Sequence, residues 1–417
     1  MKTAISSNAA GPIADGDRAE VLDALRGFAL LGIFISHVPD FSGYTFMTPL
    51  EHAGLDRFGL DGAAAALQDF LIRGKFYSLF SLMFGIGFSV QLESAARRGA
   101  DFVRHFARRL AVLLVIGLIH AGLWYGDILK DYALIGFALI LLRRSSATTI
   151  AIAAASAFAV RIVWPAAVWM LVSLPSPLSS NADPGGSFDA LTRAFGGADP
   201  SAMFLANLDL VRLKALQMIY DGRAISILAM FLLGASIGKS GLHRDVSRHR
   251  TLLRDAFRIC APIGLIGNAA LTPIHAATPD FPPTAMWVFE NSLYAIAVPA
   301  MAIAYASGFA RLWSCGRASA LRWLAPAGRM ALTTYVSQTL IGIALFYGIG
   351  LGLHGRIGLV EGMIAAIAIF ATQCAIAGLW LSRFRFGPIE WVWRRATYGA
   401  PIALVRGVSP QASRASL

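Results

Sequence analysis

The feature that most constrains the fold of this 417-residue chain is an apolar run of about 18 residues or more that recurs along its whole length. A helix of that length crosses a hydrocarbon layer about 30 Å thick. Backbone groups in lipid must be satisfied by a helix or a closed barrel, and these runs lack the alternation of barrel strands. We therefore expect an all-α, polytopic transmembrane bundle of about ten spans. The predicted spans are 20–38, 66–91, 110–126, 127–142, 148–174, 223–240, 257–274, 285–309, 326–350 and 358–381.

Composition supports a membrane protein over a soluble one. The chain is 56% hydrophobic and 14% charged, with a mean hydropathy of +0.61, whereas soluble domains are nearer a quarter charged. The formal net charge is +12. A basic patch on a soluble face would suggest nucleic acid, but here the charge is sorted by membrane side, so we expect lipid phosphates and not nucleic acid as partners.

The basic residues predict the orientation. Five segments hold 23 of the 36 lysines and arginines, and all five fall on one side of the membrane if the N-terminus is cytoplasmic. These segments are 92–109, 143–144, 239–258, 311–329 and the stretch after 382. Short cytoplasmic loops are enriched in Lys and Arg. Both termini are therefore predicted to be cytoplasmic.

The N-terminal segment and the cysteines each support a further prediction. The first 17 residues lack the basic start and apolar core of a signal peptide, so the first span is expected to remain as an anchor. The cysteines Cys260, Cys315 and Cys374 are far apart and lack metal-ligand spacing, so no metal and no bound cofactor is expected.

The predicted topology divides the chain into five parts. They are a disordered tail (1–17), a five-helix half (18–174), an external loop with a surface helix near 201–220 (175–222), a second membrane half ending in an interfacial helix (223–400) and a cytoplasmic tail (401–417).

Polar groups inside the membrane are costly, and each needs a partner, a cavity or a task. In the first span, Arg26 and His37 are eleven residues apart. They therefore share one helix face about 16 Å apart along the axis. Asp23, one turn before Arg26, can pair with it. These residues either line a common path or mark the two membrane–water interfaces, where a polar group costs little free energy.

A second histidine lies at a similar depth. His120 is in the outer half of the third span, and Asp127 follows two turns later. A histidine oriented by a carboxylate is the arrangement that general-base catalysis requires. The alternative is a lone histidine in an interfacial belt with Trp124 and Tyr125.

Further charges fall within several spans or at their ends. The residues concerned are Arg73, Lys75, Arg161, Arg223 and Glu290. Together they predict a cation-rich polar cavity that would suit an anionic or phosphate-bearing ligand.

Several of these segments resemble known families. "LDALRGFALLGIFISH" resembles the first helix of the membrane acyltransferase superfamily, in which a basic residue, ten residues and a histidine recur; here they are Arg26 and His37. Four other segments resemble the bacterial YeiB-like family, a family of membrane proteins with a domain of unknown function (418), from about residue 18 to 400. They are "GKFYSLFSLMFGIGF" (74–88), "GLIHAGLWYGDILKDYALIG" (117–136), "GRMALTTYVSQT" (328–339) and "RFRFGPIEWVWRRATYG" (383–399).

The resemblance implies a multi-pass protein of the bacterial inner membrane. It also implies transfer of an acyl group from an acyl-CoA or similar thioester co-substrate to a hydroxyl or amine of an envelope glycan, lipid or small molecule. His37 or His120 would be the base, Asp127 an orienting carboxylate, and Arg26 or Lys75 the cationic group. The rivals are a transporter or exporter of a small anionic compound and a non-catalytic membrane partner. The oligomeric state stays open.

Overall fold

A computed structural model describes residues 20–173, 184–242, 244, 246, 248–279, 282–399 and 402–406, with the backbone alone over 184–189. The predicted tail 1–17 and most of the tail 401–417 lie outside these residues. Within the described part the fold is all-α, as predicted, and the only β pairing is an isolated bridge between Phe384 and Val405.

The helices follow one another with short connections. Their bounds are α1 Glu20–Ser42, η2 Tyr44–Phe46, α2 Pro49–Leu55, α3 Asp61–Leu71, α4 Lys75–Arg97, α5 Phe102–Leu123, α6 Leu129–Leu141, α7 Ala147–Val172, α8 Pro184–Gly196, α9 Pro200–Tyr220, α10 Arg223–Lys239, α11 Arg250–Ala277, α12 Ala285–Ser314, η3 Arg317–Ala320, η4 Arg322–Leu324, α13 Ala325–Arg329, α14 Ala331–Phe346, α15 Leu359–Arg383 and α16 Pro388–Tyr398.

Seven spans in the described part are long and apolar enough to cross a membrane, and an eighth results if the bent pair α9 and α10 is counted as one. The remaining predicted spans correspond to shorter helices: α6 has 13 residues and α14 has 16. A 13-residue helix is only about 20 Å long, too short to cross the hydrocarbon core alone. The chain is therefore a multi-pass membrane protein, and the number of spans in its described part is compatible with the predicted ten.

Two glycines mark breaks between successive helices. The segment 66–91 is not continuous, because α3 ends at Leu71 and α4 begins at Lys75, with Gly74 at a φ of 80° between them. That left-handed conformation favours glycine. Likewise α9 and α10 meet at an angle of 67°, where Gly222 has a φ of 68°.

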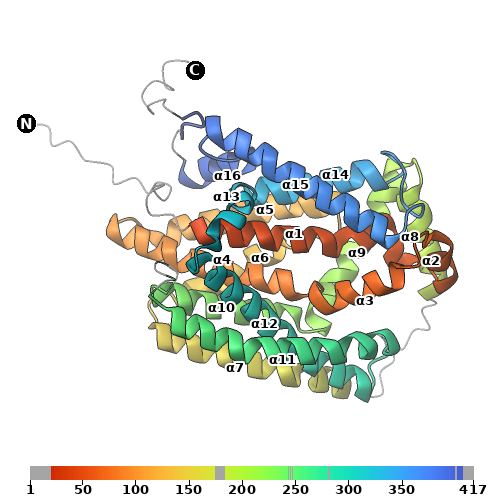
Figure 1. The fold of residues 1–417 in the computed structure, drawn as a ribbon, viewed down its shortest axis with the longest axis horizontal. Coiled ribbons are helices and arrows are strands. Elements are labelled where there is room, and N and C mark those ends of the chain that lie inside the picture. The colour runs from red at the N-terminus through yellow and green to blue at the C-terminus, as the bar shows by residue number, and fades with distance from the viewer. Residues whose placement is uncertain are drawn as a thin grey trace, which may run out of the picture.

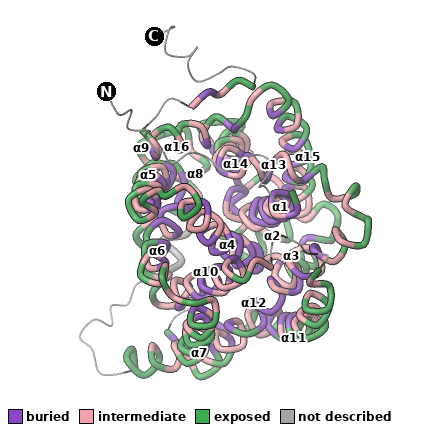
Figure 2. The backbone as a smooth tube through the Cα atoms, turned by 90° about the vertical axis from the view of Figure 1, so that its left-hand side faces the viewer, coloured by how far each residue is buried: buried purple, intermediate pink, exposed green. Residues whose placement is uncertain are grey.

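The helix α1 runs through the middle of the bundle and packs against α4, α12, α13, α14 and α15 (Figure 1). Viewed end on, it is largely buried, whereas α7 and α11 lie at the periphery with exposed outer faces (Figure 2). We call the end that holds the start of α1, the end of α4 and α16 the basic end. The opposite end, which holds α2 and α8, is the distal end (Figure 1).

A buried carboxylate ties two helices together at the distal end. Asp61, the first residue of α3, accepts hydrogen bonds from the backbone N–H groups of Leu359 (2.8 Å) and Val360 (2.9 Å). These are among the first N–H groups of α15, which have no partner inside their own helix. Asp61 thus caps α15 from a segment about 300 positions away in the chain.

Replacing Asp61 by alanine is expected to lower the free energy of unfolding by about 1–3 kcal/mol, because two buried donors lose their acceptor. The apparent melting temperature of the purified protein measures this loss. Asp209→Ala is the control, since that side chain is 73% exposed. Equal melting temperatures for the two variants would show that the cap contributes nothing.

Candidate active site

A cavity of about 240 Å³ enters the bundle from the basic end, between α1, α4, α5, α14 and α16. Its lining changes along its depth. The charged side chains belong to residues at the basic end, and apolar side chains such as Leu30, Ile33 and Leu113 line the part further along the helices. An engineered cavity of about 150 Å³ already accepts benzene. This one is larger and amphipathic, as a cavity for a charged molecule with an apolar chain would be.

The charged lining is cationic on balance. Its members are Arg26, Arg109, Arg329, Arg394, Asp23 and Glu390. Both carboxylates are engaged with the protein. Asp23 accepts from Arg26 at 2.7 Å, as the one-turn spacing predicts, and Glu390 accepts from the backbone N–H groups of Leu332 and Thr333. Arginine matches phosphate and carboxylate geometry, so this mouth suits an anionic group.

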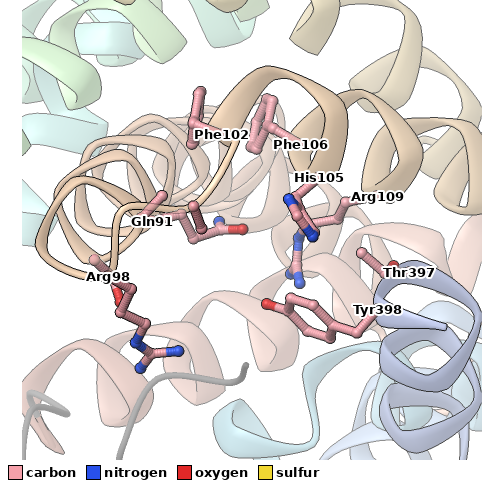
Figure 3. A pocket seen from close by; sticks show the side chains of 11 residues that line it. Gln91, Arg98, Phe102, His105, Phe106, Arg109, Thr397 and Tyr398 are labelled. Atoms are coloured by element: carbon pink, nitrogen blue, oxygen red, sulfur yellow. The ribbon is translucent and has the colours of Figure 1, made fainter. Parts of the chain in front are cut away.

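A smaller recess of about 40 Å³ adjoins the mouth (Figure 3). It shares Gln91, Phe106, Arg109 and Tyr398 with the main cavity, and His105 also lines it. The guanidinium of Arg109 stacks at 3.6 Å from the ring of Trp393 on α16. The helix α16, which was predicted to lie at the membrane interface and begins at Pro388, therefore forms one wall of the cationic mouth.

Beyond the cavity lies a buried histidine held on both sides. His120 Nδ1 is 2.7 Å from Asp127 Oδ1, and His120 Nε2 is 2.9 Å from Thr339 Oγ1. A carboxylate can only accept, so Nδ1 carries the proton and Nε2 is left to accept from the threonine hydroxyl. His120 and Thr339 are each 2% exposed. Hydroxyl, imidazole and carboxylate are thus in line, which is the arrangement that activates a nucleophile.

The carboxylate reaches the histidine because α5 stops early. The helix ends at Leu123, and Trp124 is extended (φ −153°, ψ 125°). Asp127 therefore does not continue the histidine's helix, as the sequence suggested; it folds back onto it. Its second oxygen accepts from the backbone N–H of Lys130 at 3.0 Å. The ammonium of Lys130 lies 3.9 Å from the same carboxylate.

One aromatic residue separates this histidine from the cavity. Tyr335 lines the cavity, and its ring centroid is 5.1 Å from that of His120. It lies one helical turn before Thr339 on α14, so both side chains share a face. The cavity therefore ends one side chain away from the hydrogen-bonded chain of Asp127, His120 and Thr339.

The other predicted histidine is close but not connected to the cavity. His37 packs edge-on against Trp124, with ring centroids 4.4 Å apart, and Trp124 in turn lies 6.3 Å from His120. Arg26 lines the cavity and His37 does not. The cavity along α1 thus stops short of His37, and the ring of Trp124 neighbours both histidines.

Each charged residue of the predicted cation-rich cavity has a partner within the protein, and Tyr294 lies within electrostatic range of both Arg73 and Arg223. Arg73 pairs with Asp69 and Arg223 with Asp221. Arg161 is 2% exposed and donates to Ser226 and to the carbonyl of Asn291. Lys75 donates to the carbonyl of Asp69, and Glu290 pairs with His275. None of the five predicted residues lines either cavity described above.

Sequence reasoning missed Thr339, Tyr335 and Lys130. Thr339 and His120 are 219 positions apart, and no local pattern connects them. The available signal was the segment "GRMALTTYVSQT", which contains both Tyr335 and Thr339, and Lys130 within "GLIHAGLWYGDILKDYALIG".

The chain is similar to known proteins over most of its length. Residues 237–400 match the family described as "Protein of unknown function (DUF418)". The chain is 32% identical over 410 residues to the uncharacterised protein YxaH of Bacillus subtilis (strain 168), covering 93% of this chain and 96% of that one. It is 28% identical over 407 residues to the uncharacterised protein YeiB of Escherichia coli (strain K12), covering 92% and 97%.

Proposed function

The chain belongs to the YeiB-like family of proteins of unknown function (DUF418), and we propose that it is a membrane acyltransferase that carries the acyl group on Thr339. One observation carries this proposal. Asp127, His120 and Thr339 form a hydrogen-bonded line, and that line lies one side chain beyond an amphipathic cavity. The basic end is taken as cytoplasmic and the membrane as the bacterial inner membrane.

The cavity suits an acyl-CoA-like donor. The phosphates of such a donor would meet the arginines at the mouth, and the acyl chain would lie along the apolar walls. Arg26 is at the mouth beside Asp23, a position that fits phosphate binding. Lys75 lies outside the cavity, so it takes no part in the reaction proposed here.

In the first half-reaction, the Thr339 hydroxyl oxygen attacks the thioester carbonyl. His120 accepts the hydroxyl proton at Nε2, and Asp127 stabilises the imidazolium that forms. The carbon–sulfur bond then breaks, and His120 returns the proton to the departing thiolate. The products are an ester on Thr339 and a free thiol, so atoms and charges balance.

In the second half-reaction, a hydroxyl or amine of the acceptor attacks that ester. His120 takes the acceptor proton and delivers it to the Thr339 oxygen as the ester bond breaks. The acceptor leaves acylated and Thr339 is regenerated. His37 neighbours the same Trp124 ring as His120 and lies outside the donor cavity, so the role proposed for it is to position the acceptor.

Tyr335 separates donor from histidine until the site is occupied. A side chain in this place excludes water, which would otherwise hydrolyse an activated ester. The donor must displace it to reach Thr339. The proposed reaction therefore includes a rotation of Tyr335 as the thioester enters.

Filling the cavity tests the donor site. Gly87 lies on α4 in the cavity wall, and a Cβ added there would meet no atom within 4 Å. Gly87→Leu is therefore expected to fold normally and to raise the KM for a long-chain acyl-CoA at least about tenfold, because its side chain would occupy the space of the chain. Gly62→Leu is the control, since Gly62 is also helical and unobstructed but lies outside the cavity.

An unchanged KM in Gly87→Leu would show that the donor binds elsewhere. The rival function, transport of a small anion, predicts a different result. In proteoliposomes, flux of an anionic compound in the absence of any acyl donor would favour a transporter and overturn the acyltransferase.

A further inference from the structure

A group of buried aromatic residues lies toward the distal end, next to the hydrogen-bonded chain of Asp127, His120 and Thr339. It contains Trp124, Tyr125, Tyr347 and His354, with Phe41 and Phe195 between them. The rings form a connected set: Phe41 stacks on Trp124 at 4.6 Å, Phe195 lies 4.9 Å from Tyr347, and Tyr347 lies 6.1 Å from His354. We call these six residues the distal aromatic cluster.

The cluster concentrates unpartnered polar atoms. Three buried side-chain atoms of the cluster have no hydrogen-bond partner in the described part of the chain: Trp124 Nε1, Tyr347 Oη and His354 Nε2. A fourth, Tyr125 Oη, has the Asp40 carboxylate as its polar neighbour. The four residues are between 0% and 6% exposed. Folded proteins leave few buried polar groups unpaired, so this concentration indicates a ligand that would pair with them.

The chemistry of these atoms defines that ligand. His354 Nδ1 lies 3.0 Å from the Phe41 carbonyl, which can only accept, so Nε2 is a lone-pair acceptor. Burial lowers the pKa of His354, which keeps it neutral. The indole donates, and the two phenols both donate and accept. All four groups are neutral and are interleaved with aromatic faces, and the charged group near the two tyrosines is the Asp40 carboxylate. This combination matches the hydroxyls and C–H faces of a sugar ring and not an anion.

We propose that the distal aromatic cluster binds a neutral, hydroxyl-rich ligand, such as a hexose unit, through Trp124, Tyr125, Tyr347 and His354. Phe195 is 1% exposed and packs against the rings of Tyr125, Tyr347 and His354; the ligand takes the place of this ring on entry. The role of the ligand as acyl acceptor rests on the proposed function. Its binding does not.

Tyr347→Phe tests the proposal, with Tyr305→Phe as the matched control. Tyr305 already donates to the Leu71 carbonyl at 2.8 Å. Removing a partnered hydroxyl is expected to lower the melting temperature of the ligand-free protein, whereas removing the unpartnered hydroxyl of Tyr347 is expected to raise it. The full chain is used in nanodiscs free of glycoside detergents, which would compete for the site.

Binding of a methyl hexoside is then measured by saturation-transfer NMR. We expect saturation in the wild type and in Tyr305→Phe, and a Kd about fivefold weaker in Tyr347→Phe. An octyl glucoside arm separates a lipid-linked sugar from a free one, because a gain in affinity over the methyl hexoside indicates the glycolipid. No binding, equal binding of an anionic hexuronate, or a lower melting temperature in Tyr347→Phe would overturn the proposal.

These outcomes are independent of catalysis. If the hexoside binds but no acyl transfer occurs, the proposed function fails and this site stands. If acyl transfer to a non-sugar acceptor occurs without hexoside binding, this inference fails and the acyltransferase stands.

Discussion

Replacing His120 by asparagine is expected to reduce the rate of acyl transfer by about 10³-fold, because general-base assistance by a positioned side chain is worth about 10²–10⁴ in rate. Asparagine can still donate to Asp127, so the fold keeps a partner for the buried carboxylate. It cannot accept and release the proton of Thr339. The measurement is kcat with an acyl-CoA donor in reconstituted membranes.

The control for this variant is His275→Asn. His275 is also held by a carboxylate, at 2.7 Å from Glu290, but it is 31% exposed and lines neither cavity. Its replacement is expected to leave kcat within about twofold, as for a site remote from the chemistry. Comparable losses in both variants would show that a histidine–carboxylate pair matters for stability and not for catalysis.

Thr339→Val is expected to abolish transfer, because valine has the shape of threonine and lacks the attacking oxygen. Removing a catalytic nucleophile costs about 10⁴–10⁶ in rate. Thr339→Ser keeps the hydroxyl and should retain measurable activity. Thr334→Val is the matched control on the same helix, since it removes a buried hydroxyl that donates only to the Ala327 carbonyl. Activity retained in Thr339→Val would remove the threonine from the reaction.

Sequence alone predicts much of the fold, because apolar runs of span length have few alternatives in a membrane. It also predicts the Asp23–Arg26 pair, since one helical turn brings such residues together. It does not predict the interruption at Gly74, because that break depends on a backbone turn that an apolar composition does not reveal.

The sequence predicts only the part of the candidate site whose residues are close together in the chain. His120 and Asp127 are near in sequence, so a contact between them can be inferred, although the chain reversal at Trp124 that makes it was not. Thr339 comes from a helix more than 200 positions later, and only packing brings it to the histidine. The predicted cation-rich cavity stays a prediction; Arg73 and Arg223 have carboxylate partners two to four residues away, which a search for charges inside spans does not take into account.

The most direct test of the account is the search for an acyl group on Thr339. The purified chain in nanodiscs is incubated with acyl-labelled acetyl-CoA and with a long-chain acyl-CoA, without acceptor, then acid-quenched, digested and analysed by mass spectrometry. The account predicts an acyl ester on the peptide that contains Thr339 in the wild type and in Thr334→Val, and none in Thr339→Val or His120→Asn. Absence of this ester while the donor is consumed, or its appearance at another residue, would contradict the central claim.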